Sequence, residues 1–213
     1  NQLTNGAGYI TSIAGALTSL SGKLNEYTST SSTSFTKPSG TTSHIVICIG
    51  GGGGSGSAEG ANSGQTAPPG VGISRRGGCG ATVLQVYNED QMGSGAAMSL
   101  GAGGAAGNVR GSGSNGADTT FNPNGTGVTM TAKGGRGSSY ANETGNSTTY
   151  ADYPANATGS SGGHYWDGPG REFGAVLGGI NYGYGGAGVS ASGDYNDSAG
   201  NPGNSGLIIV ISF

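Results

Sequence analysis

Hydrophobic residues recur every three or four positions at the start of the chain. Their spacing is that of an a/d heptad seam, which predicts a short coiled coil. Glycine, serine and threonine within the segment are poor helix formers, so the helix would need partner chains or a longer upstream shaft. An isolated amphipathic helix packed on its own domain is the alternative, and the narrow seam favours self-association. The seam residues are Ile10, Ile13, Leu17, Leu20, Leu24 and Tyr27.

The hydrophobic pattern changes after this seam. Residues 28–34 read TSTSSTS, a polar stretch without an apolar anchor, which is typical of a linker. We therefore expect two parts. Residues 1–33 form a trimerising shaft or coiled-coil segment with its linker, and residues 34–213 form the second, larger domain.

Short strands are predicted within the larger domain, and none of its segments has a helical pattern. The runs HIVICI at 44–49 and LIIVISF at 207–213 are nearly continuous in apolar residues, as expected for central strands covered on both faces. We expect these two strands to pair or to lie next to each other. Further strands are predicted at 81–87, 96–102 and 127–132. The fold class is therefore mostly β, with a glycine-rich domain that resembles a β-sandwich.

Glycine supplies 49 of the 213 residues, including five in a row at 50–54. Such stretches stay disordered unless backbones pack closely, because glycine loses much backbone freedom on folding and has no side chain to pack. The low charged fraction of 9% argues against a solvated, disordered tail. Collagen is excluded, since the 7 prolines are too few and no period of three is sustained.

A local period of three is nevertheless present. Glycines at 101, 104, 107, 113 and 116 share one phase, which Arg110 interrupts. Polyproline-II helices have three residues per turn, so glycine on one edge would let such helices pack backbone to backbone. The alternative is chance, because glycine is so frequent in this chain.

Charge and cysteine content exclude several classes of protein. The net charge of −3 and the scattered Lys and Arg residues give no footprint for nucleic acid. Two cysteines, Cys48 and Cys79, are too few for a disulfide framework, and a single bridge is an alternative to buried free thiols. With only His44 and His164 as histidines, the sequence indicates no metal site, and it indicates no cofactor. The chain opens without a signal-like segment, so we expect a fragment of a longer protein.

The order of these segments resembles the glycine-rich C-terminal domain of bacteriophage tail fibres. The resemblance covers residues 34–213 and rests on SFTKPSGTTSHIVICIGGGGGSGS, GGCGATVLQVYNEDQMGSGAAMSLGAGGAAGN, GVTMTAKGGRG and NSGLIIVISF. The N-terminal NQLTNGAGYITS is also similar to segments repeated in tail-fibre shafts. No single motif is diagnostic, and the specificity lies in the ordered set.

The resemblance implies a homotrimeric fibre tip on an upstream shaft, assembled in the bacterial cytoplasm and carried on the virion. Its partner would be a lipopolysaccharide glycan or an outer-membrane protein of a bacterium. Some phage adhesins at this position fold as stacked polyproline-II helices with receptor specificity in the loops. The strong strands of this chain depart from an all-polyglycine pattern. A phage-derived fibre on a bacterial surface is the alternative reading.

Receptor contact needs side chains, so interruptions of the glycine background are the candidate sites. Residues 140–173 are the largest interruption, and aromatic faces with nearby carboxylates suit a sugar or a protein pocket. The alternative for HYWDGPG is a loop folded on its own small core. A second aromatic set, Tyr182 and Tyr184, has a structural role as its alternative. The candidates in the first set are Tyr140, Tyr150, Asp152, Tyr153, His164, Tyr165, Trp166, Asp167 and Arg171.

Two further readings concern charged residues. Lys133 and Arg136, with the pair at 75–76, would suit phosphates, although such residues are more often only solvated. Glycosidases need two carboxylates across a cleft, which two of Asp152, Asp167 and Glu172 could supply. The sequence gives neither an obvious burial site to raise the pKa of one carboxyl nor a Ser-His-Asp pattern, so we expect no enzymatic activity.

Overall fold

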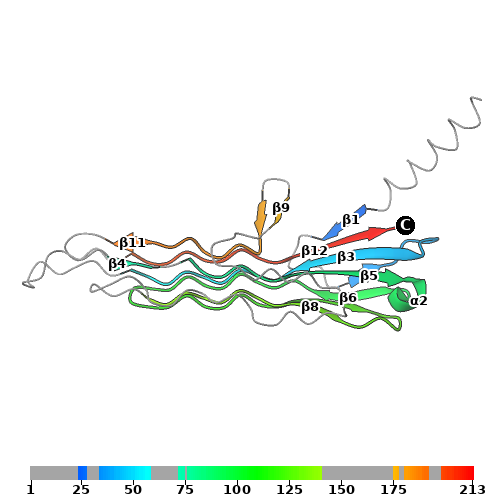
Figure 1. Ribbon diagram of the computed structural model, residues 1–213, viewed down its shortest axis with the longest axis horizontal. Coiled ribbons are helices and arrows are strands. Elements are labelled where there is room, and N and C mark those ends of the chain that lie inside the picture. Colours follow the sequence, from blue (N-terminus) through cyan, green and yellow to red (C-terminus); the bar gives the residue numbers. More distant parts are fainter. Residues whose placement is uncertain are drawn as a thin grey trace, which may run out of the picture.

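The computed structural model describes residues 24–27, 34–58, 72–74, 76–140, 175–177, 180–191 and 198–213. These residues are mostly β, and two antiparallel sheets lie at one end (Figure 1). Glycine-rich chains run from the sheets to the opposite end, where the short strands β4 (Gly72–Ile73) and β11 (Ser190–Ala191) pair.

The first sheet contains the two strands that the sequence predicts most strongly. Its order is β1-β12-β3-β5, and every neighbouring pair is antiparallel. The prediction that the runs at 44–49 and 207–213 lie together is confirmed, since Ile47 pairs with Ile209. The strand bounds are β1 (Leu24–Tyr27), β12 (Leu207–Ser212), β3 (Ser43–Ile49) and β5 (Thr82–Asn88).

The second sheet has the order β2-β6-β7-β8 and includes strands that the pattern does not predict. The expected strand at 96–102 ends at Ser99, where the glycine-rich chain begins, and the one at 127–132 starts only at Met130. Neither β2 nor β7 was expected, because both are short and the TTFNP of β7 ends in proline. The bounds are β2 (Ser34–Thr36), β6 (Gly95–Ser99), β7 (Thr119–Pro123) and β8 (Met130–Ala132).

Residues from both sheets form one core. Phe121 of β7 lies 5.9 Å from Tyr87 of β5 and 6.2 Å from Phe35 of β2, measured between ring centroids. The Tyr87 hydroxyl donates a hydrogen bond to the Val128 carbonyl at 2.8 Å, so the one polar group of this buried ring is satisfied. Val46, with other residues of the first sheet, lies in the same core cluster.

The expectation that β3 and β12 are covered on both faces is wrong for the described chain. Burial alternates along β3, and Ile45 and Ile47 remain partly exposed while Val46 and Cys48 are buried. Within the described chain, the near-continuous apolar runs therefore have one buried face and one partly exposed face. The partly exposed face is considered again below.

One helical turn, α2 (Glu89–Met92), connects β5 to β6, although no helix was expected. The Asn88 side chain accepts a hydrogen bond from the Gln91 N–H at 2.9 Å, and the Gln91 side chain accepts one from the Asn88 N–H at 3.0 Å. This reciprocal capping box stabilises a turn too short to show a hydrophobic period. Lys37 makes an ion pair with Glu89 at 2.7 Å, and this hydrogen bond lowers the pKa of the Glu89 carboxyl.

The prediction of a coiled-coil helix is wrong for the last two residues of the heptad seam. Leu24 and Tyr27, expected on a helix, belong to β1, where they pair with Ile211 and Ile208. By pairing with the edge of β12, β1 gives hydrogen-bond partners to the backbone groups of that edge. A helix at these residues would leave the same groups of β12 unpaired. The other seam residues, Ile10, Ile13, Leu17 and Leu20, lie outside the described residues.

The glycine-rich part is built around one chain, residues 50–58, which we call the central chain. Its backbone N–H groups donate to three neighbouring segments in turn, 78–81, 111–117 and 198–204, and return to the same segment every third residue. The donors are Gly50 and Gly53 to the first segment, Gly51, Gly54 and Ser57 to the second, and Gly52, Ser55 and Ala58 to the third. A β-strand has a period of two, so the central chain follows instead the three-residue repeat of a polyproline-II-type helix.

Carbonyl groups of the central chain accept hydrogen bonds from further segments. Gly51 and Gly54 accept from residues 135 and 138, Gly52 and Ser55 accept from 104 and 107, and Gly53 accepts from 186. With the three donor directions, these contacts surround the central chain with six segments. The directions in which the carbonyl groups accept also repeat every three residues. The three-residue glycine spacing is therefore better explained by packed extended helices than by chance.

Side chains are excluded where these segments touch. A Cβ added to Gly53 would overlap the Arg136 carbonyl, and one added to Gly54 would overlap the Ala105 carbonyl. The same holds for the glycines of the three-residue phase, since a Cβ at Gly104 would overlap the Ser114 carbonyl. Backbones therefore pack as closely as they do only because glycine occupies these positions.

Candidate functional site

Several chain connections meet at the end of the bundle away from the two sheets. The chain leaves the described part after Ala58 and re-enters at Gly72, and it leaves again after Ala191 and returns at Ser198. Ala58 forms an isolated β-bridge with Ser198, and Gly72 pairs with Ala191, so each exit lies beside the return point of the other connection at this end. Figure 1 shows β4 and β11 here, far from the C-terminus. We call this region the distal end.

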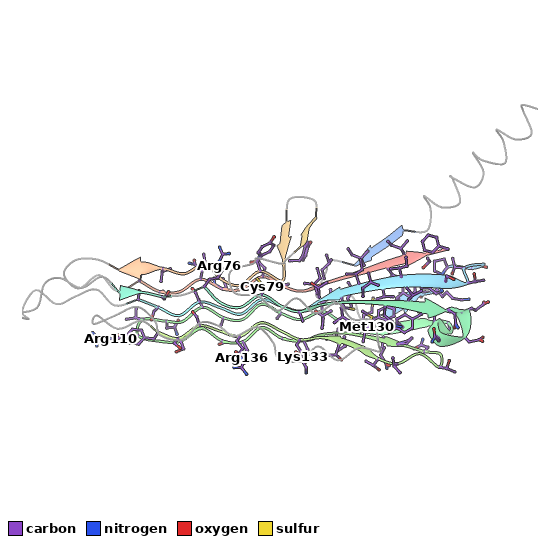
Figure 2. The ribbon with its side chains drawn as sticks, viewed as in Figure 1. Arg76, Cys79, Arg110, Met130, Lys133 and Arg136 are labelled. Atoms are coloured by element: carbon purple, nitrogen blue, oxygen red, sulfur yellow. The ribbon has the colours of Figure 1, made fainter. Side chains whose placement is uncertain are left out.

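A tight turn at residues 108–110 belongs to the distal end. The Gly111 N–H donates to the Asn108 carbonyl at 2.7 Å, and Arg110 has a φ of +62°, which is uncommon for a residue other than glycine. Val109 in the same turn is 56% exposed. Figure 2 places Arg110 at this end, so the turn presents one apolar and one cationic side chain there.

Tyr140 is the only member of the first candidate set within the described residues. Its N–H donates to the Ser112 hydroxyl at 3.2 Å, and the adjacent Ser139 backbone lies beside Gly56 of the central chain. Its side chain is half-buried. The aromatic interruption at 140–173 therefore starts from the bundle near the distal end. Its other candidates, Tyr150, Asp152, Tyr153, His164, Tyr165, Trp166, Asp167 and Arg171, lie outside the described residues.

Three side-chain acceptors support the segment that leads to Tyr140. The hydroxyl of Ser112, the amide oxygen of Asn115 and one carboxylate oxygen of Asp118 accept hydrogen bonds from backbone N–H groups of that segment. The donors are Tyr140, Gly137 and Gly134, so both rows have a spacing of three. These acceptors escaped the sequence analysis, although polar residues spaced by three beside the glycine phase are a readable signal.

Asp118 also binds the Lys133 ammonium, at 2.6 Å. Burial acts to raise the pKa of the Asp118 carboxyl, but the hydrogen bonds from Lys133 and the Gly134 N–H outweigh it and lower that pKa. The Lys133 charge is thus compensated within the chain, which weakens the reading of Lys133 as a phosphate contact. Arg136 is exposed on the same side of the bundle (Figure 2).

The two tyrosines of the second aromatic set differ in their burial. Tyr182 is 5% exposed and packs with Ile49 and Leu207, so its ring belongs to a small core where the hairpin of β9 (Ala175–Leu177) and β10 (Ile180–Tyr182) meets the first sheet. The Tyr184 side chain is half-buried, and its carbonyl accepts a hydrogen bond from the Asn204 N–H at 2.8 Å. The structural role is thus the observed one for Tyr182.

Buried reactive groups lie away from the distal end. Cys48 and Cys79 are both free and buried, so the disulfide alternative is wrong, and burial raises the pKa of the Cys48 thiol. Within the described ranges, no group of three or more His, Cys, Asp or Glu residues could hold a metal ion. The search of the same residues for a helix long and apolar enough to span a membrane found none.

Comparison with known proteins adds no family assignment. No protein-family model matches the chain, and no curated protein matches its sequence. The functional argument therefore rests on the residues and on the geometry of the bundle.

Proposed function

We propose that the chain is the receptor-binding tip of a phage tail fibre, an adhesin that attaches the virion to a lipopolysaccharide glycan or an outer-membrane protein. In this proposal the fibre is a homotrimer on an upstream shaft. The observation that carries the proposal is the separation of roles along the molecule. The glycine bundle uses its backbone for cohesion, and the connections that follow Ala58, Asn108 and Ala191 meet at its distal end.

Binding proteins commonly place recognition residues on loops held by a rigid scaffold. In the described chain, the central chain is bonded to segments on all sides, so it can hold connections in fixed relative positions without a side-chain core. The connections can then differ in length and sequence without disturbing the backbone packing. Such an arrangement suits a protein whose target surface varies.

The chemistry of the connections also supports adhesion. The sequence between Tyr140 and Phe173 holds aromatic rings, carboxylates and Arg171, a combination that stacks on sugar faces and bonds their hydroxyls. Val109 and Arg110 add an exposed apolar and a cationic side chain at the distal end, near the described Tyr140 from which that sequence begins. Recognition then depends on a cluster of loops and requires no catalytic group.

Adsorption to host cells tests the proposal. The purified full chain is expected to bind susceptible cells and to block phage adsorption, and host mutants lacking either the glycan or the membrane protein identify the receptor class. A variant with Tyr153, Tyr165 and Trp166 all changed to Ala is expected to lose at least ten-fold in affinity. The control is Val128→Ala, an exposed position in the turn before β8, at the sheet end.

Two outcomes count against the proposal. The absence of binding to any strain that the parent phage infects would overturn the adhesin function. Unchanged binding by the folded triple variant would overturn the site, while leaving adhesion through other residues. Depolymerisation of host polysaccharide by the purified chain would replace the adhesin with the glycosidase reading.

A further inference from the structure

One face of the first sheet carries an uninterrupted set of aliphatic side chains. Two rows cross the strands β12, β3 and β5, and the strand register aligns the members of each row. The rows are Ile211, Ile45 and Val86, then Ile209, Ile47 and Leu84. We call these six residues the outer apolar face.

Burial separates this face from the core side of the same strands. Successive side chains of a strand point to opposite faces, and the alternate residues such as Val46, Val83 and Val210 are buried between the sheets. On the outer apolar face Leu84 is 38% and Val86 is 53% exposed, and the four isoleucines are partly exposed. The six residues themselves carry no charge, and in β1 the register continues the first row with Leu24 and the second with Glu26.

Among the described residues, cover is present at one edge of the outer apolar face. Tyr182 packs over Ile49 and Leu207, the next row toward the glycine bundle, and reaches Ile47 and Ile209 only in part. At the other edge Phe213 is 40% exposed. Contiguous apolar surface of this kind is rare on a soluble monomer and marks a surface that packs on another chain.

The position of the heptad seam indicates the occupant. The seam residues up to Leu20 come just before β1 in the sequence, and Leu24 of β1 pairs with Ile211, a member of the outer apolar face. Chains that associate through the seam would therefore bring their first sheets together at this row. Tethering raises the effective concentration of the faces to about the millimolar range, so each contact can be individually weak.

We propose that the outer apolar face packs against the same face of further copies of this chain, continuing the self-association begun by the heptad seam. This inference rests on the homotrimer of the proposed function and is independent of which receptor the distal end binds. The six side chains are all aliphatic, so identical faces can bury them against one another, with Glu26 of β1 at the edge of the contact. An intramolecular cover by residues 1–23 is the competing outcome.

The test is the molar mass of the full chain in solution. Val86→Lys places a charge in the outer apolar face at a position exposed enough for the monomer to fold. Val128→Lys is the matched control, since Val128 is also 53% exposed but lies outside that face. Sedimentation equilibrium is expected to give a trimer for the wild type and the control, and at least a hundred-fold weaker association for Val86→Lys.

The outcomes separate this inference from the proposed function. A wild-type monomer, or a Val86→Lys protein that associates like the control, would overturn the interface. If Val86→Lys unfolds, Leu84→Gln replaces it, and unchanged association of that variant overturns the interface equally. Cell binding is measured on the same samples. A wild-type trimer that dissociates in the variant but binds no host cell supports the interface and overturns the adhesin.

Discussion

The N–H of Gly54 donates to the carbonyl oxygen of Ser114 at 2.9 Å, although neither residue belongs to a β-strand. The next bond between the same two segments lies three residues along each, from Ser57 to Gly111. This spacing turns the backbone groups of the central chain toward all of its neighbours, and at the five glycines of residues 50–54 it leaves no room for a side chain.

Adding a methyl group at Gly54 is therefore expected to destabilise the fold strongly. The Cβ of Gly54→Ala would overlap the Ala105 carbonyl, which is backbone and cannot rotate away. We expect a loss of at least about 3 kcal/mol in the free energy of unfolding, at the upper end of overpacking effects. Urea denaturation followed by circular dichroism measures it.

Ser114→Ala is the control for this substitution. Its exposed side chain lies on the segment that Gly54 contacts, and the change leaves the backbone bond intact. We expect a change within about 0.5 kcal/mol. Equal stability of Gly54→Ala and Ser114→Ala would show that the segments are not packed backbone to backbone.

Removing a side-chain acceptor should have a smaller effect. Asn115→Ala deprives the Gly137 N–H of its partner at 2.9 Å, and a lost hydrogen bond of this kind costs about 0.5–1.5 kcal/mol. Asn115→Asp keeps an oxygen at the same position and serves as the control. Hydrogen exchange of the Gly137 amide should accelerate in Asn115→Ala only. Equal exchange rates in the two variants would contradict the assigned role of Asn115.

The strands and the bundle differ in how far the sequence predicts them. The runs that became β3 and β12 have a strong apolar pattern, so both their existence and their pairing could be predicted. β7 could not, because its five residues carry a proline and little apolar character. The glycine phase at 104 and 107 was visible, but glycine alone does not reveal which segments neighbour one another.

The candidate site was predictable only in part. For Tyr182 the sequence left contact and a structural role open, and the structural role depends on Leu207, far along the chain. The acceptor row of Asn115 and Asp118 depends equally on a neighbour set by topology. Local sequence fixes the chemistry of such residues, and the fold decides whether they face a partner chain or their own backbone.

The two thiols should be unreactive in the native protein. Cys48 is fully buried, Cys79 is 7% exposed, and burial raises the pKa of the Cys48 thiol, so little thiolate is available at neutral pH. We expect no reaction with a thiol reagent before unfolding and reaction of both cysteines in denaturant. The control is the denatured protein without a reductant. Fewer than two reactive thiols in that sample would indicate a disulfide and contradict the two free cysteines.

Acid should destabilise the fold through His44. This side chain is fully buried, and burial, followed by the charge of Lys37, lowers the pKa of its imidazole, while Glu89 acts weakly in the opposite direction. Nδ1 lies 2.8 Å from the Ser212 hydroxyl, and Nε2 has no hydrogen-bond partner among the described residues. Protonation would therefore add a charge that the site does not stabilise.

The direction of the change in stability with pH follows from the lowered pKa of the His44 imidazole. Above about pH 6.5 the imidazole is neutral in both the folded and the unfolded chain, so His44 gives no pH dependence there. As the pH falls below that value, the unfolded chain takes up the proton first, and the free energy of unfolding decreases by up to about 1.4 kcal/mol per pH unit until the folded-state pKa is reached. Urea denaturation between pH 7.5 and 5 measures this slope, and His44→Gln should remove the part due to His44 while His164 remains. A slope unchanged by His44→Gln would show that His44 takes up protons equally in both states.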